Sequence, residues 1–349
     1  MSSKPEATLL MTCVGGELAP QALQYMRNST RYRIRTVGVD ASPSAVGRHF
    51  CDAFHVVPRG TEAGYVDAVR AVAEREGVQI VLPSSDEEAI ALSAGRAALE
   101  KGGRLLACTD AATIRVFSSK AATHAAIARA GLAVPEWTEV TTLAQLTVAV
   151  DKMLQARGEA VVKPSGGRGG RGAVVIQKDI EGVAPPLPGA REIHCGVTYY
   201  REHLLAHSES SLPAIVMQRL EEPVHDIDML GWHGQPVRVV ARRRLNSQQP
   251  NEGHTVVNSP ALLQLGRSLI EHFNLSWLYD CDVMFDAAGM PYVVEINPRP
   301  SGSVTVTICA GVPLYDDIVA LARGEAVAEV PFPAGRTVVP YRALQPSSR

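Results

Sequence analysis

The sequence predicts an α/β protein of several domains, and three stretches support this fold class. Residues 7–108 alternate short apolar strands with helical segments, which is typical of a parallel sheet covered by helices. A glycine-rich segment at 165–172 lies between two apolar strands, and residues 282–299 read as an acidic hairpin. With 349 residues the chain is long enough for about two or three domains with substantial cores.

Composition and charge exclude several classes of function. Hydrophobic residues make up 46% of the chain and charged residues 20%, and the net charge of −2 gives no electrostatic basis for binding nucleic acid or a membrane surface. No stretch approaches the ~18 apolar residues of a membrane span, and the first residues do not resemble a secretory signal. The six cysteines show no metal-ligand spacing. We therefore expect a cytoplasmic protein with reduced cysteines.

The first elements form a βαβ unit. An apolar strand at 7–14 breaks at Gly15 and Gly16, a helix covers 20–26, and a second strand at 32–39 ends in Asp40. A glycine pair and an acid at these places can indicate dinucleotide binding, as in a nicotinamide oxidoreductase. The complete G-x-G-x-x-G signature is missing, however.

A polar loop follows the next strand of this domain. A helix at 65–76 and a strand at 79–82 lead into residues 83–88, which begin another helix. Such loops at the carboxyl ends of parallel strands commonly bind ligands. Asp86 and Glu87 can contact a substrate amine or only stabilise the helix N-terminus, and both interpretations stay open. A short strand at 105–108 then precedes a domain boundary near residue 112.

The glycine-rich segment indicates a phosphate-binding flap. A helical region at 110–130 carries Lys120 near its middle, and a strand at 159–164 carries Lys163 at its end. Glycines allow backbone amides to approach an anion closely, and Arg168 and Arg171 add positive charge. No Walker A sequence or helix follows, so a flap between two strands is the better explanation. The alternative is a flexible hairpin tip.

The next segments alternate apolar and charged residues. A strand at 214–220 precedes an acidic stretch, and a strand at 237–245 carries four arginines, one of which can face a phosphate site or lie on a solvated edge. Helices are expected at 261–273 and 315–323. The acids are Glu221, Glu222, Asp226 and Asp228, and the arginines are Arg238, Arg242, Arg243 and Arg244.

The hairpin at 282–299 has the features of a metal site. Glu295 and Asn297 are two apart on one strand and therefore share a face, and Asp282 can oppose them from the partner strand. Oxygen ligands suit Mg²⁺ bound together with nucleotide phosphates. Arg299 follows Pro298, where its guanidinium can reach a phosphate or carboxylate.

Taken together, these motifs resemble those of the ATP-grasp superfamily over nearly the whole chain. The residues that carry the resemblance are the strand and loop at 161–172, Asp282, and the run from Glu295 to Gly302. The segment 311–324 is similar to the one that follows the metal motif in the large chain of carbamoyl phosphate synthetase. The resemblance implies an ATP-grasp fold with an N-terminal Rossmann-like domain at 1–112, a central subdomain with the flap at 113–215, and a C-terminal subdomain with the metal site at 216–349.

The resemblance also implies roles for individual residues. ATP would bind between the last two subdomains. Its phosphates would lie at the lysines and the flap glycines, and its adenine at the hinge strand, residues 217–220. Either Asp226 or Glu221 would bind the ribose. Mg²⁺ or Mn²⁺ would be held by Asp282, Glu295 and Asn297, and Arg299 and Lys163 would act in catalysis. The nucleotide-binding set is Lys120, Lys163, Gly167, Gly169, Gly170, Met217, Gln218, Leu220, Glu221 and Asp226.

The chemistry implied by the resemblance is ATP-dependent ligation of a small carboxylate to an amine through an acyl phosphate. One alternative is phosphorylation of bicarbonate, as in carbamoyl phosphate synthetase, although that large chain holds a second ATP-grasp copy. A nucleotide-binding protein without turnover is another alternative, which the complete ligand set disfavours. We expect small-molecule carboxylate and amine partners, no nucleic acid or membrane partner, and a homodimer.

Overall fold

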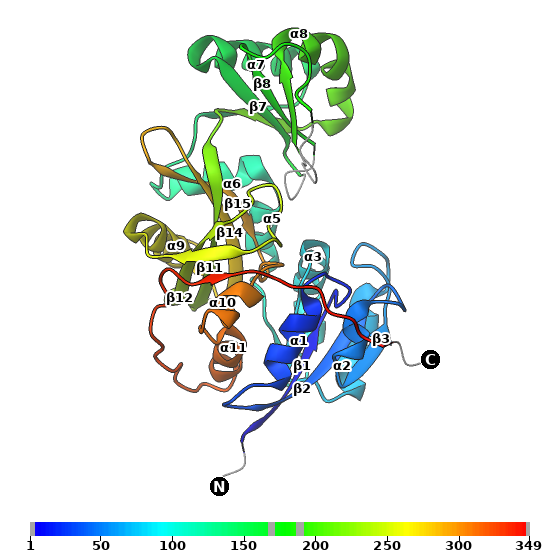
Figure 1. Ribbon diagram of the computed structural model, residues 1–349. Helices are drawn as coiled ribbons and strands as arrows, with labels where there is room; N and C mark the ends of the chain where they lie inside the picture. The colour runs from blue at the N-terminus through cyan, green and yellow to red at the C-terminus, as the bar shows by residue number, and fades with distance from the viewer. Residues whose placement is uncertain (1–3, 167–171, 186–191, 347–349) are drawn as a thin grey trace.

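Three β-sheets follow one another along the molecule (Figure 1). The structure is a computed structural model that describes residues 4–166, 172–185 and 192–346. The N-terminal sheet lies at the bottom of Figure 1, the C-terminal sheet in the middle and the central sheet at the top. The mixture of helices and strands confirms the predicted α/β fold class.

The N-terminal domain is a parallel sheet of order β3-β2-β1-β4-β5 with helices packed against it. Its strands are short and apolar because helices bury both faces of the sheet. The expected βαβ opening is confirmed, although β5 is shorter than the strand expected at 105–108. The elements are β1 Glu6–Met11, α1 Ala19–Arg27, β2 Arg33–Asp40, η1 Val46–His49, β3 Ala53–Val56, α2 Tyr65–Arg75, β4 Ile80–Leu82, α3 Asp86–Ala94, α4 Arg96–Leu99 and β5 Leu105–Leu106.

The acid at the end of β2 supports a loop of its own domain. Asp40 accepts hydrogen bonds from the backbone amides of Gly15, at 2.7 Å, and Ser42, at 2.8 Å. Its carboxylate therefore closes the loop after β1, which gives Gly15 and Asp40 a structural role.

The central sheet has the order β6-β10-β7-β8-β9 and packs against α7. The glycine-rich segment connects the antiparallel strands β7 and β8, as expected, and Gly167, Gly169 and Gly170 lie outside the described residues. The expected domain limit at 215/216 falls inside β10. The elements are β6 Trp137–Val140, α7 Leu143–Arg157, β7 Glu159–Pro164, β8 Ala173–Gln177, β9 Glu192–Gly196, α8 Val197–Tyr199, η2 Tyr200–Leu204, η3 Ala206–Ser211 and β10 Ala214–Met217.

The C-terminal sheet is antiparallel, with the order β15-β14-β11-β12-β13-β16. The predicted hairpin is confirmed as β14 and β15. The acidic stretch after residue 220 is itself part of a long strand, β11. The elements are β11 Glu221–Trp232, β12 Gln235–Arg244, β13 His254–Val257, α9 Pro260–His272, β14 Trp277–Phe285, β15 Pro291–Asn297, α10 Thr305–Cys309, α11 Leu314–Ala322 and β16 Thr337–Val338.

The helical region expected at 110–130 consists of two helices, α5 Ala111–Phe117 and α6 Lys120–Arg129. Ser119 caps the second helix by accepting a hydrogen bond from the amide of Ala122. Lys120 is therefore the first residue of α6 and does not lie in the middle of a helix, which corrects the expectation. Phe117 and Ile127 pack in the core of the C-terminal sheet.

The N-terminal domain shares a core with the end of the chain. Leu23 and Met26 of α1 belong to the same buried cluster as Leu314 and Ile318 of α11. Burial of this apolar surface fixes the N-terminal domain against the C-terminal sheet.

Candidate active site

The alternation of side chains places four aspartates on one face of the C-terminal sheet. Ile227 and Cys281 point into the core beneath α9, so their neighbours in sequence point to the opposite face. Residues opposite one another in the register are Asp226 and Asp282, Asp228 and Asp280, Asp280 and Asn297, and Asp282 and Glu295.

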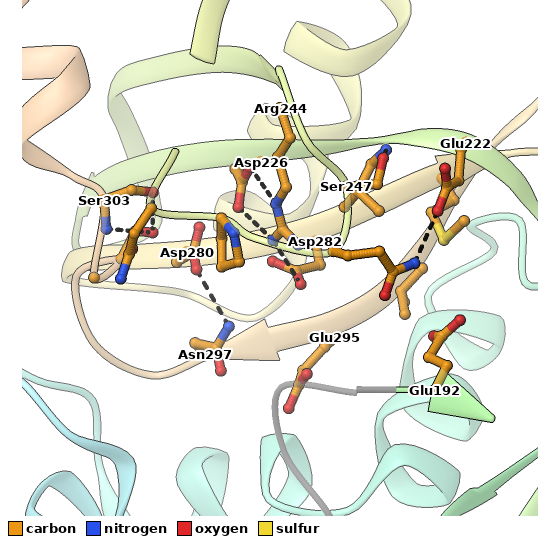
Figure 2. Close-up of a pocket in the computed structure, with 18 of the residues that line it drawn as sticks. Glu192, Glu222, Asp226, Arg244, Ser247, Asp280, Asp282, Glu295, Asn297 and Ser303 are labelled. Carbon is orange, nitrogen blue, oxygen red and sulfur yellow. Dashed lines mark hydrogen bonds and ion pairs between the residues drawn. The ribbon is translucent and has the colours of Figure 1, made fainter. Parts of the chain in front are cut away.

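A β-bulge in β15 lies next to Glu295 and affects the direction of its side chain. Asp282 pairs with Glu295 but Val283 pairs with Val293, so Val294 is the extra residue on β15. Bulges bend a strand and redirect its side chains, and they are frequent beside active sites. Val294, Glu295 and Asn297 all line one pocket on this face of the sheet, which is called the cleft below (Figure 2).

The carboxylates form a cluster that suits a hard cation. Oxygens of Asp226, Asp280 and Asp282 lie within 4.8 Å of one another. Oδ1 of Asp280 and Oδ1 of Asp282 are buried and accept no hydrogen bond from the described residues. Asn297 donates a hydrogen bond to Oδ2 of Asp280 at 3.3 Å, as Figure 2 shows. Because unpaired buried oxygens are costly, an oxygen-coordinated metal ion such as Mg²⁺ fits this donor set.

The electrostatics of the cluster reflect burial and crowding of like charges. Burial, with the nearby Asp226 and Asp282, raises the pKa of Asp280 well above its usual range. The pKa of Asp282 is also raised, first by burial, although Arg244 opposes the shift. A bound cation would favour the ionised form of both carboxylates.

Arg244 is the arginine of β12 that lines the cleft. It donates two hydrogen bonds to Asp226, at 2.9 and 2.7 Å, and its Nη2 lies 2.9 Å from Asp282. The other three lie elsewhere: Arg238 pairs with Asp317, Arg242 is buried against Asp228, and Arg243 is exposed.

The structure does not support either acid expected at the ribose. Asp226 is 1% exposed and contacts Arg244 and His254, so it belongs to the acid cluster. Burial would raise the pKa of Asp226, but Arg244 and His254 outweigh burial and hold it below the usual range. Glu221 lies outside the lining of the main cleft and of the pocket at the hinge, whereas Glu222 lines both.

Arg299 connects two domains. Its Nη2 lies 3.2 Å from Oδ2 of Asp86, the first residue of α3, and its Nη1 lies 3.8 Å from Asp280. The buried Asp86 thus contacts an arginine of the cleft, while Glu87 is exposed. Two carboxylates hold the guanidinium at the end of β15.

Two buried lysines face the acids from the other side of the cleft. Lys120 and Lys163 are each 8% exposed and line the cleft, and Nζ of Lys120 lies 4.0 Å from Glu295. Burial lowers the pKa of Lys120, an effect that Glu295 opposes and Lys163 reinforces. Helix α6 and strand β7 therefore each contribute a lysine to the cleft that the acids line.

A smaller pocket, lined by apolar and polar residues, continues from Lys163 along residues 217–220, where β10 ends at Met217. Met217 and Leu220 line it, together with the side chain of Gln218, whose Oε1 accepts a hydrogen bond from the amide of Glu136 at 2.9 Å. Sequence reasoning missed several residues that complete this pocket and the cleft, since they are far apart in the chain. They are Val161, Val175, Glu192, His194, Glu222, Asp280 and Met284.

The fold and the site together define an ATP-grasp architecture, and comparisons of sequence support this class. Residues 210–343 match the family model "ATP-grasp in the biosynthetic pathway with Ter operon", and residues 9–106 match the model of the PylC-like N-terminal domain. The first stretch thus matches an ATP-grasp family and the second a PylC-like N-terminal domain. No curated protein sequence matches it significantly.

Solved structures of ATP-grasp enzymes have the same fold. N5-carboxyaminoimidazole synthetase from Staphylococcus aureus is 14% identical with a TM-score of 0.67, covering 94% of this chain and 81% of its own. L-amino acid ligase from Bacillus licheniformis is 14% identical with a TM-score of 0.65, and the match covers 92% of this chain and 75% of the ligase. The biotin carboxylase domain of Hydrogenobacter thermophilus 2-oxoglutarate carboxylase is 16% identical with a TM-score of 0.65, covering 94% and 72%.

No helix among residues 4–166, 172–185 and 192–346 has the length and hydropathy needed to cross a bilayer.

Proposed function

We propose that the protein is an ATP-dependent carboxylate-amine ligase that releases ADP and phosphate. The observation that carries this proposal is the convergence of three groups on one cleft. An oxygen-rich face, two buried lysines and a fixed arginine meet beside the hinge pocket. Among structures with this fold, one is named an L-amino acid ligase and others were solved with ADP or MgADP.

The nucleotide would occupy the cleft between the central and C-terminal sheets. Adenine would lie among the apolar side chains at the hinge, beside Met217, Gln218 and Leu220. Glu222 would bind the ribose hydroxyls in place of Glu221 or Asp226, because it lines both the hinge pocket and the cleft. Lys120 and Lys163 would neutralise the phosphates. The roles of Gly167, Gly169 and Gly170 remain predictions.

Asp282, Glu295 and Asn297 would hold Mg²⁺, for which Mn²⁺ could substitute. When bound, the ion would supply positive charge that offsets the negative charge developing during phosphoryl transfer. Arg244 contacts Asp282 and so restricts the position of that carboxylate.

The protein's part in the reaction is to position reactants and stabilise charge. A carboxylate oxygen of the first substrate attacks the γ-phosphorus of ATP, the bond to the bridging oxygen breaks, and ADP leaves. Arg299, held by Asp86 and Asp280, faces the transferred phosphoryl group. The amine then attacks the carbonyl carbon of the acyl phosphate, and an amide, phosphate and a proton are released.

A trapping experiment tests this proposal. Purified protein with Mg²⁺ and ATP is incubated with pools of carboxylic acids, including amino acids and bicarbonate, in the presence of hydroxylamine. Hydroxylamine converts an acyl phosphate into a hydroxamate, whose mass identifies the acid. A hydroxamate formed together with ADP would support the ligase.

The other outcomes distinguish the alternatives. ADP release that depends only on bicarbonate would indicate a carbamoyl phosphate type of reaction, and nucleotide binding without ADP release from any pool would contradict an enzymatic role. A cytoplasmic location and a homodimer remain predictions.

A further inference from the structure

A second cavity lies beside the cleft, between α1, α10 and the segment that follows β16. Figure 1 shows that this C-terminal segment runs across the N-terminal domain. The cavity has a volume of about 90 Å³, and most of its lining is apolar. The apolar lining residues are Leu18, Tyr25, Pro250, Val306, Val338, Val339, Pro340 and Tyr341.

This apolar cavity adjoins the cleft directly. Pro250, Asn251 and Ser303 line both spaces, so these residues lie at their boundary. Asn251 is held there by a hydrogen bond to Glu17 at 3.0 Å. A sufficiently long molecule whose reacting end lies beside Arg299 can therefore reach the second cavity past Asn251 and Ser303.

The two spaces differ in chemistry. The cleft is lined by charged side chains, whereas the second cavity is lined by apolar and uncharged polar side chains and exposes hydrophobic surface at its rim. Val339 is 61% exposed and Tyr341 is 76% exposed. Covering such surface with an apolar group is favourable, whereas a charged group would lose hydration without gaining a partner of opposite charge.

We infer that the apolar cavity receives an aliphatic or aromatic group of the substrate that is ligated in the cleft. The inference rests on the proposed function and narrows it, since it requires a substrate with a sizeable apolar group. The apolar group can belong to the carboxylate substrate or to the amine substrate, and separate tests are needed to tell which of the two carries it.

Cys309 provides a readout that needs no turnover. Its thiol is free and exposed and lies in the lining of the apolar cavity. The rate of alkylation by N-ethylmaleimide is measured by mass spectrometry of the Cys309 peptide. The protein is tested with MgADP and straight-chain α-amino acids from alanine to 2-aminooctanoate. The half-buried Cys51 of the N-terminal domain serves as an internal reference.

We expect protection of Cys309 to increase with chain length. Each added methylene should lower the half-protective concentration about fourfold until the cavity is full. Alkylation of Cys51 should not change. Repeating the series with plain carboxylic acids and with alkylamines identifies the source, because only the substrate that carries the apolar group should show the length dependence.

A filling variant tests the same inference through selectivity. Cys309→Phe places an aromatic ring in the cavity, and the preference for long over short substrates in ADP release should fall at least about tenfold. Val148→Phe is the matched control, because Val148 is 68% exposed on α7 of the central domain. This control should keep the wild-type preference.

The outcomes separate this inference from the ligase proposal. Protection that is independent of chain length, or a Cys309→Phe variant with unchanged selectivity, would overturn the inference even if ADP is released. Length-dependent protection in a protein that releases no ADP would contradict the ligase and still support an apolar ligand site.

Discussion

Replacing Arg242 with methionine should destabilise the C-terminal sheet. Arg242 and Asp228 are both 0% exposed. The arginine donates hydrogen bonds to Asp228 at 2.8 and 3.0 Å and to Oγ of Ser303 at 3.0 Å. Removing one partner of a buried ion pair costs about 3–5 kcal/mol. Because Thr307 also donates a hydrogen bond to Asp228, we expect a loss near the lower limit, about 3 kcal/mol.

The assay follows unfolding of this sheet alone. Trp232 and Trp277 lie in the C-terminal sheet with ring centroids 4.8 Å apart, and the third tryptophan is Trp137 in the central sheet. In a Trp137→Phe background, tryptophan fluorescence during urea titration therefore reports the C-terminal sheet, so that the other domains do not obscure the transition.

A double-mutant cycle provides the control. Replacing Asp228 with leucine in the Arg242→Met variant removes the uncompensated charge, so the double variant should recover at least about 1 kcal/mol relative to the single variant. A loss below about 1 kcal/mol for Arg242→Met alone, or a double variant as unstable as the sum of the single variants, would refute the reasoning.

Three further predictions concern nucleotide chemistry and pH. Glu295→Gln should lower ADP formation at least about a hundredfold while the circular dichroism spectrum stays unchanged, because a metal-ligand charge is lost; turnover near that of wild type would disprove the metal assignment. Glu222→Gln should raise the KM for ATP about tenfold and Glu221→Gln less than about twofold, so equal effects would contradict the ribose assignment. Burial, reinforced by Lys163 and then Lys120, lowers the pKa of His124 to about 4 from 6.5, so the unfolded chain takes up a proton that the folded protein excludes. Stability linked to His124 is thus complete above pH 6.5 and lost as the pH falls toward 4, by about 2 kcal/mol at pH 5. Urea titrations above pH 6.5 and at pH 5 should show that His124→Leu abolishes this loss of stability. His272→Ala, at an exposed histidine, should retain the loss. A loss retained in His124→Leu would show that other groups cause it.

The hairpin and the flap strands could be predicted because their signals are local. Period-two alternation and a turn at Asp286 to Gly289 define β14 and β15, and the spacing of Glu295 and Asn297 places them on one face. The break between α5 and α6 was missed because alanine-rich sequence on both sides of Ser119 favours one continuous helix.

The sequence does not show which acids of β11 point into the cleft. The register with β14 is irregular between Glu221 and His225, so counting residues from the hinge does not show which glutamate faces the cleft. Asp280 escaped notice for another reason. Its place beside Asn297 and Arg299 depends on pairing between strands and on the loop after β15, which no single stretch of sequence encodes.

The contact between Asp86 and Arg299 restricts how this protein can be divided or recombined. The guanidinium that we propose to face the phosphoryl group comes from the C-terminal part of the chain, while one of its two carboxylate partners comes from the first domain. A chimera that keeps the sheets and the lysines but receives a foreign first domain would therefore lose an anchor of its arginine. The N-terminal domain consequently contributes to the proposed active site and is not an interchangeable module.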